Sequence, residues 1–198
     1  MIVYKICKAF CRIVGPIMYR FKITGLENIP KEGAFLLCSN HIHAFDPIVL
    51  SMYLKREPRF MGKKELFKSG FGKWFFTSYG AYPVDRSAAA DMYAYRTTLD
   101  LLKNNNGIVI FSQGTRMKEF ENAKGGVAVF AIKSGAPIIP AGISGSYKLF
   151  SKIHINYGEP ISMDEYAGQK VKTEIVDEIM QNVIARVSVL SSPQGRVE

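Results

Sequence analysis

The feature that most constrains the fold is a regular alternation, after Gly25, between short apolar runs and longer stretches with helical periodicity. The apolar runs have the length and composition of buried strands and lie at 34–38, 59–62, 81–84, 107–111, 137–143 and 153–157. The helical patterns lie at 47–54, within 64–79, and at 88–103, 125–134 and 175–187. Strands separated by helices predict an α/β fold: a single-domain layered mixed sheet flanked by helices, with an active site at strand ends.

The N-terminal residues predict an amphipathic basic helix. At about 100° per residue, the apolar side chains of Ile2, Ile6, Phe10, Ile13 and Ile17 fall on one side, and Lys5, Lys8 and Arg12 fall on another. Pro16 predicts a break, with 18–22 continuing as a second turn or short helix. Such a helix can lie in a lipid interface or pack on the core with a solvated basic edge, and the pattern alone leaves both open.

Length and composition predict one folded domain. With 198 residues and a hydrophobic content of 47%, the chain can enclose one core. This composition argues against a disordered protein and against a polytopic membrane protein. We expect a membrane-contacting segment at 1–23, the domain at 24–190 and a frayed tail at 191–198. No run reaches the roughly 18 apolar residues of a spanning helix, so contact with a bilayer is expected at its surface.

The net charge of +9 favours nucleic acid, an anionic membrane surface or phosphate-bearing substrates. Aromatic side chains do not interleave with clustered basic residues and no nucleic-acid-binding motif appears, so we expect no nucleic-acid partner. Cys7, Cys11 and Cys38 have neither zinc-site spacing nor the density of a disulfide scaffold, which favours a reducing cytosolic setting.

The first candidate for catalysis is the segment from Asn40 to Asp46. His41 directly follows a predicted buried strand, and Asp46 stands immediately before Pro47. Asp-Pro before an apolar helical run predicts Asp46 as an N-cap with Pro47 at the first helical position. A turn can also bring Asp46 back against His41, where a carboxylate on one imidazole nitrogen makes the other a general base. His41 and His43 can also be read as metal ligands, although no third ligand beyond Asp46 is evident.

A second polar loop, after the predicted strand at 107–111, suggests a phosphate clamp. Gly114 permits a tight turn, Thr115 offers a hydroxyl, and Arg116 presents a planar fork that matches phosphate oxygens. Taken alone, one arginine after Gly-Thr is more often a solvated surface residue than a phosphate ligand.

Together the two motifs resemble the glycerolphosphate acyltransferase superfamily, particularly the 1-acylglycerol-3-phosphate acyltransferases. The resemblance covers about residues 24–161 and has four ordered blocks: Asn40, His41 and Asp46; 64–66 with 80–86; 111–116; and 136–140. Segments 124–126 and 158–161 are also similar. The chain departs from the family pattern at Ser112, Gln113 and Met117 of the third block and at His43 of the first. Gln113 keeps the reach of the family's glutamate and loses its charge.

The resemblance implies an enzyme that moves a fatty acyl group from acyl-CoA or acyl carrier protein to 1-acylglycerol 3-phosphate, with no cofactor or metal. It implies His41 as general base, oriented by Asp46. It assigns the substrate phosphate to Arg116, Thr115, Gly114, Gln113, Arg86 and Lys64, and the vicinity of the acyl site to Ile138, Ile139 and Pro140.

The expected partners are therefore an anionic lysophospholipid, the thioester donor and a membrane surface. The implied location is the cytoplasmic face of the cell membrane, as a peripheral or monotopic protein. Another lysophospholipid or glycerol 3-phosphate as acceptor, and a non-catalytic lipid-binding relative, stay open as alternatives.

Overall fold

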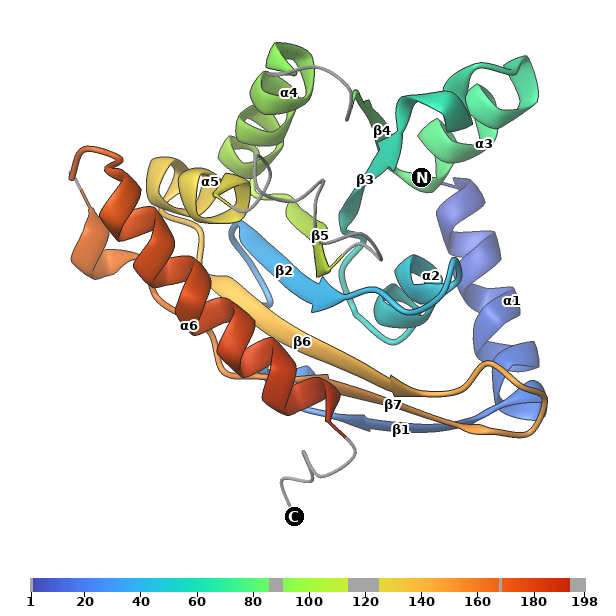
Figure 1. The fold of residues 1–198 in the computed structure, drawn as a ribbon. Helices are drawn as coiled ribbons and strands as arrows, with labels where there is room; N and C mark the ends of the chain where they lie inside the picture. The colour runs from blue at the N-terminus through green and yellow to red at the C-terminus, as the bar shows by residue number, and fades with distance from the viewer. Residues whose placement is uncertain (1, 86–90, 114–124, 168, 193–198) are drawn as a thin grey trace.

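A computed structural model describes residues 2–85, 91–113, 125–167 and 169–192, and these residues form one mixed sheet with helices on both faces (Figure 1). The sheet has seven strands in the order β1-β7-β6-β2-β5-β3-β4. The strands are β1 (Arg20–Thr24), β2 (Phe35–Asn40), β3 (Arg59–Lys63), β4 (Ala81–Val84), β5 (Gly107–Gln113), β6 (Ile138–Gly145) and β7 (Lys152–Tyr157). The predicted α/β fold class is confirmed.

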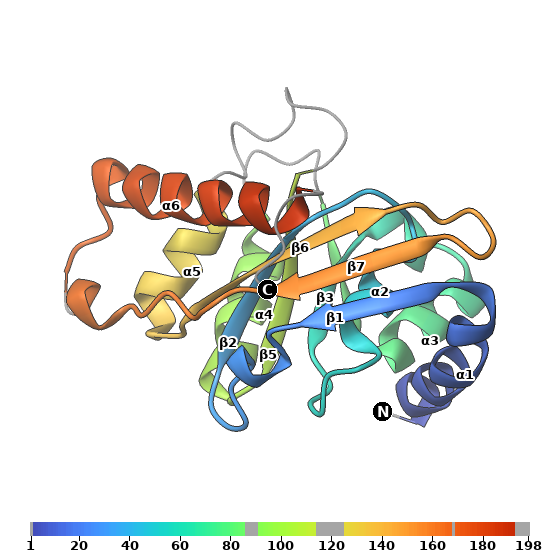
Figure 2. The same ribbon diagram turned by 90° about the horizontal axis from the view of Figure 1, so that it is seen from below.

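The helices form a layer on each face of the sheet (Figures 1 and 2). One layer holds α1 (Ile2–Met18), α2 (Asp46–Ser51) and α3 (Gly70–Tyr79), and the other holds α4 (Met92–Lys103), α5 (Gly126–Ser134) and α6 (Thr173–Ser191). Short 3-10 turns lie at η1 (Leu26–Asn28), η2 (Lys64–Phe67) and η3 (Asp164–Tyr166). The helices predicted at 47–54, within 64–79, and at 125–134 and 175–187 are present, with ends that differ by a few residues, and α4 covers the described part of the helix predicted at 88–103.

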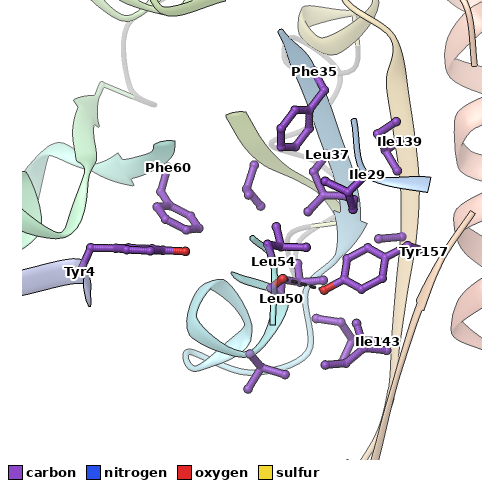
Figure 3. Close-up of a cluster of buried hydrophobic side chains, with 14 of the residues drawn as sticks. Tyr4, Ile29, Phe35, Leu37, Leu50, Leu54, Phe60, Ile139, Ile143 and Tyr157 are labelled. Carbon is purple, nitrogen blue, oxygen red and sulfur yellow. Dashed lines mark hydrogen bonds between the residues drawn. The ribbon is translucent and has the colours of Figure 1, made fainter. Parts of the chain in front are cut away.

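The central strand β2 is buried along its whole length, which explains why it appears in the sequence as a continuous apolar run. Its side chains alternate between two cores. Phe35 and Leu37 join a cluster beneath α1, α2 and α3, shown in Figure 3 with side chains from β6 and β7. Leu36 and Cys38 join the cluster beneath α4, α5 and α6. Both cores therefore hold β2 in place.

The strand directions bring several strand ends to one edge of the sheet. β6, β5, β3 and β4 run parallel with β2 and its neighbours, whereas β7 is antiparallel to β6. Asn40, at the end of β2, pairs with Gln113, at the end of β5, after a shift in register. The ends of β2, β3, β4 and β5 consequently lie along the edge where active sites of such sheets form.

Two expectations for the N-terminal segment are wrong. The helix does not break at Pro16 but runs on to Met18, because a proline in the last turn removes few helical bonds and the Tyr19 amide still donates to the Gly15 carbonyl. No short helix covers 18–22. Instead, these residues belong largely to β1, which pairs in parallel with β7. Phe21 of this strand packs against the core.

The apolar side of α1 faces away from the domain, whereas an amphipathic helix packed on a core turns its apolar side inward. Its apolar residues Ile2, Ile6, Phe10, Ile13 and Ile17, here called the outer stripe, are 63–76% exposed. The opposite side packs on the domain: Tyr4 is buried, Lys8 donates to the Leu54 carbonyl and Arg12 lies over the ring of Tyr53. The core therefore does not account for the outer stripe. Within the described residues, no helix combines the length and apolar character needed to cross a bilayer.

Candidate active site

His41 and Asp46 meet at the end of β2. His41 Nδ1 lies 2.7 Å from Asp46 Oδ2, and the backbone amides of Ile42 and His43 donate to the same oxygen at 2.6 and 2.7 Å. The Asp46 amide in turn donates to the His43 carbonyl at 2.9 Å. The turn after β2 thus closes around one carboxylate oxygen, and the predicted approach of Asp46 to His41 is confirmed.

The prediction that Asp46 caps α2 is wrong. The N-cap is Phe45, which makes no side-chain capping bond, and Asp46 is already the first helical residue with Pro47 beside it in the first turn. The reason is that the Asp46 carboxylate points back into the turn and accepts hydrogen bonds there. Its function in the local structure is to order the loop that carries His41.

The charge of Asp46 is stabilised although its side chain is fully buried. Burial alone raises the pKa of this carboxyl, but hydrogen bonds from His41, Tyr147 and the His43 and Ile42 amides outweigh burial and lower it below the ordinary value. An ionised carboxylate only accepts hydrogen bonds, so Nδ1 of neutral His41 carries the proton and Nε2 has the free lone pair. The imidazole therefore has the tautomer that a general base needs.

His41 is held in this orientation by packing as well. Its side chain is 33% exposed, and its ring stacks on Phe111 of β5 with the centroids 4.3 Å apart. One side of the imidazole is thus covered while the rest remains accessible from the edge of the sheet. This is the geometry expected of a base that meets a substrate from solution or from a membrane.

Tyr147, after β6, was not predicted and contacts both parts of the motif. Its hydroxyl donates to Asp46 Oδ1 at 2.6 Å, and its ring stacks on His43 with the centroids 4.2 Å apart. Burial, together with the Asp46 carboxylate, raises the pKa of Tyr147, so the phenol stays a protonated donor. His43 Nδ1 accepts from the Phe45 amide at 3.3 Å. Among the described side chains, no group of three or more His, Cys, Asp or Glu residues could hold a metal ion.

Asn40 fixes the residue before His41 to the neighbouring strand. Its side-chain Nδ2 donates to the Ile143 carbonyl at 2.8 Å, and its Oδ1 accepts from the Ile143 amide at 2.7 Å. The side chain thereby continues the pairing of β2 with β6 beyond Ser39 and Ala141, where the backbone ladder ends. This pairing explains an asparagine at the last position of a buried strand.

Replacing Asn40 with alanine is expected to lower the free energy of unfolding by about 2–4 kcal/mol. The change leaves the buried Ile143 amide and carbonyl without these partners, and each lost bond of this kind costs about 1–3 kcal/mol. Urea unfolding followed by circular dichroism measures the loss. The matched control is Asn182→Ala at an exposed position of α6, where the Asn182 side chain accepts a hydrogen bond from the Arg186 side chain. An equal loss in both variants contradicts this role of Asn40.

The residues expected to bind phosphate are described only in part. Lys64 begins η2 after β3 and pairs with Asp85, which follows β4. A phosphate at Lys64 would compete with that ion pair. Gln113 ends β5 beside Asn40, as its backbone pairing places it. Gly114, Thr115, Arg116 and Arg86 lie outside the described residues, so their assignment stays a prediction.

Ile138, Ile139 and Pro140 form the first part of β6, beside Leu36, Leu37 and Cys38. Ile138 and Ile139 are fully buried, one in each core cluster. In this structure they act as core residues, and their proximity to an acyl chain stays a prediction.

Comparison with known proteins gives one consistent family. A family model described as acyltransferase matches residues 20–144. The 1-acyl-sn-glycerol-3-phosphate acyltransferase of Bacillus subtilis is 30% identical over 170 residues, covering 83% of this chain and 85% of the relative. The protein of the same name from Streptococcus pneumoniae is 26% identical over 79% of this chain and 61% of its own.

A solved structure also has this fold. The crystal structure of the 1-acyl-sn-glycerophosphate (LPA) acyltransferase of Thermotoga maritima matches with a TM-score of 0.70 at 22% identity. The match covers 92% of this chain and 77% of that one.

Proposed function

Because this chain belongs to the acyltransferase family, we propose that it transfers a fatty acyl group from a thioester, acyl-CoA or acyl carrier protein, to the free hydroxyl of 1-acylglycerol 3-phosphate. The product is phosphatidic acid and the free thiol of the donor. The names of the relatives support the acceptor, and the His41–Asp46 geometry supports the chemistry.

In the proposed reaction, His41 Nε2 removes the proton of the acceptor hydroxyl as its oxygen attacks the thioester carbonyl carbon. A new C–O bond forms, and the carbonyl oxygen becomes an oxyanion. When the oxyanion collapses, the C–S bond breaks, and the leaving thiolate takes the proton from the imidazolium. Asp46 stabilises that imidazolium through Nδ1, and no acyl-enzyme is formed.

The observation that carries this proposal is the 2.7 Å contact between His41 Nδ1 and the ionised, fully buried Asp46. In this contact Nδ1 is bonded to Asp46, and Nε2 is left to act as the base. The substrate phosphate is proposed to bind at Arg116, Thr115, Gly114, Gln113, Arg86 and Lys64. In the chain, Lys64 directly follows β3, Arg86 comes two residues after β4, and Gln113 is the last residue of β5, with Gly114, Thr115 and Arg116 next in sequence.

Thiol release tests the proposal directly. The protein is mixed with vesicles containing 1-acylglycerol 3-phosphate and with acyl-CoA or acyl carrier protein, and free thiol is measured over time. Release that depends on the acceptor supports the proposal. If thiol is released only with glycerol 3-phosphate or with another lysophospholipid, that compound is the acceptor. If the protein binds vesicles but releases no thiol with either donor, it is a non-catalytic lipid-binding relative.

The outer stripe supports contact with a membrane surface. Five aliphatic and aromatic side chains stand exposed along α1, and α3, which packs on α1, exposes Phe71 and Trp74. Such a surface can enter the boundary between headgroups and acyl chains, while the net charge of +9 favours anionic lipid. We propose that α1 docks the enzyme on the cytoplasmic face of the membrane, where the acceptor resides.

Placing charge in the outer stripe is expected to weaken vesicle binding by about tenfold or more. In the variant Ile6→Asp with Ile13→Asp, two side chains that would each contribute about 1.5–3 kcal/mol on full burial instead carry charge. Cosedimentation with anionic vesicles measures the change. The control Val189→Asp alters an exposed apolar residue of α6, on the opposite face of the sheet, and should bind as the wild type does. Equal binding by all three proteins contradicts docking through α1.

A further inference from the structure

Tyr147 donates a hydrogen bond to the one carboxylate oxygen of Asp46 that receives no hydrogen bond from the catalytic loop. Ile42, His43 and His41 all donate to Oδ2, whereas the Tyr147 hydroxyl donates to Oδ1. A carboxylate bonded at one oxygen alone can rotate about its Cβ–Cγ bond, and a second bond at the other oxygen fixes its plane. The plane of this carboxylate sets the direction in which Oδ2 meets His41 Nδ1.

Tyr147 is itself held by contacts from two directions. Its ring lies edge-on to Tyr19, just after α1, with the centroids 5.9 Å apart, and it stacks on His43 from the catalytic loop. The connection between β6 and β7 that carries it is closed by bonds from the Ser146 amide to the Lys152 carbonyl and from the Phe150 amide to the Met18 carbonyl. The hydroxyl is therefore presented to Asp46 from a supported position.

We infer that Tyr147 is a positioning residue for acyl transfer, which acts through Asp46 to keep the His41 imidazole oriented toward the acceptor hydroxyl. The inference rests on the proposed function, because it assigns Tyr147 a part in that reaction. Tyr147 and Asn40 then support the motif at both ends, since Asn40 pairs with Ile143 before His41 and Tyr147 bonds Asp46 after it.

The test is Tyr147→Phe, which removes the hydroxyl and keeps the ring that stacks on His43. We expect kcat for thiol release to fall about 10- to 100-fold, the range that corresponds to losing one hydrogen bond to a charged group. KM for both substrates should stay within about twofold of the wild-type values, because the lost hydrogen bond orients the base and is not assigned to substrate binding.

The pH profile separates positioning from a general loss of structure. The titratable side chains in contact with Tyr147 or Asp46 are His41, His43 and Tyr19. Without the phenol, the Asp46 carboxylate is no longer held in one plane, and it stabilises the His41 imidazolium less well. The acid limb of kcat/KM should consequently move to lower pH.

The matched control is Tyr157→Phe. Tyr157 is a buried tyrosine whose hydroxyl donates at 2.6 Å to the Leu50 carbonyl, so it anchors the body of α2 without touching Asp46. Its loss should lower the thermal midpoint and leave kcat and the pH profile unchanged. Both variants are assayed well below their thermal midpoints, so that loss of folded protein does not enter kcat.

The possible outcomes are distinct. A wild-type protein that releases no thiol with any donor or acceptor overturns the proposed function and with it this inference. If the wild type is active, a Tyr147→Phe variant with unchanged kcat and acid limb overturns the inference alone. Equal losses in the two tyrosine variants also overturn it, because Tyr147 would then support the fold and not the base.

Discussion

Alanine at position 41 is expected to lower kcat for thiol release by about 10²- to 10⁴-fold, the range that general-base catalysis supplies. The variant loses the nitrogen that takes the acceptor proton, while Asp46 keeps its bonds from the Ile42 and His43 amides and from Tyr147. The loop should therefore stay folded. Vesicle binding through α1 should be unchanged, so the loss appears in kcat and not in membrane association.

The comparison variant is His154→Ala, which removes a histidine from β7 rather than from the loop. It should retain wild-type turnover. If His41→Ala released thiol at the wild-type rate, the proposed mechanism would be wrong even though the chain belongs to the acyltransferase family, and another group would have to act as the base.

Much of the fold could be predicted because its central strands are buried on both faces. Continuous apolar runs such as the one at 34–38 leave few alternatives to a strand between two helical layers. β1 was missed because its five residues, RFKIT, include exposed positions and a pattern that a short helix also fits. Only the pairing with β7, far away in the sequence, decides between them.

The site could be predicted where its contacts are local. His41 and Asp46 are five residues apart, so one turn is enough to join them. Tyr147 is 101 residues from Asp46, and the Asn40 partner Ile143 is 103 residues away. No spacing in the sequence signals either contact, because both depend on β6 lying next to β2. The sequence also does not signal whether the outer stripe of α1 faces the core or the solvent.

Asparagine at position 46 is the second change with a large expected effect, about 10²- to 10³-fold in kcat. The backbone amides of Ile42 and His43 can only donate, so the asparagine oxygen must take the place of Oδ2 and its amino group must face Tyr147. His41 Nδ1 then still has an acceptor, and the tautomer is kept. In Ser-His-Asp triads the equivalent change costs about 10⁴-fold because the imidazole adopts the wrong tautomer; here the loss should be smaller, since what disappears is the charge that stabilises the imidazolium.

The same variant should be less stable at neutral pH by about 2–4 kcal/mol, because three hydrogen-bond donors and the phenol lose a charged partner in a buried site. The difference in free energy of unfolding between the wild type and this variant should become smaller in acid. The pKa of Asp46 is lowered by folding, so its contribution is present above the pKa of the unfolded chain, about 3.9, and is lost as the pH falls through the folded value. Urea unfolding of both proteins at neutral pH and below about pH 4 measures this. A gap that stays constant with pH would mean that the buried carboxylate does not stabilise the loop through its charge, and the orientation of His41 would then rest on Phe111 and the backbone alone.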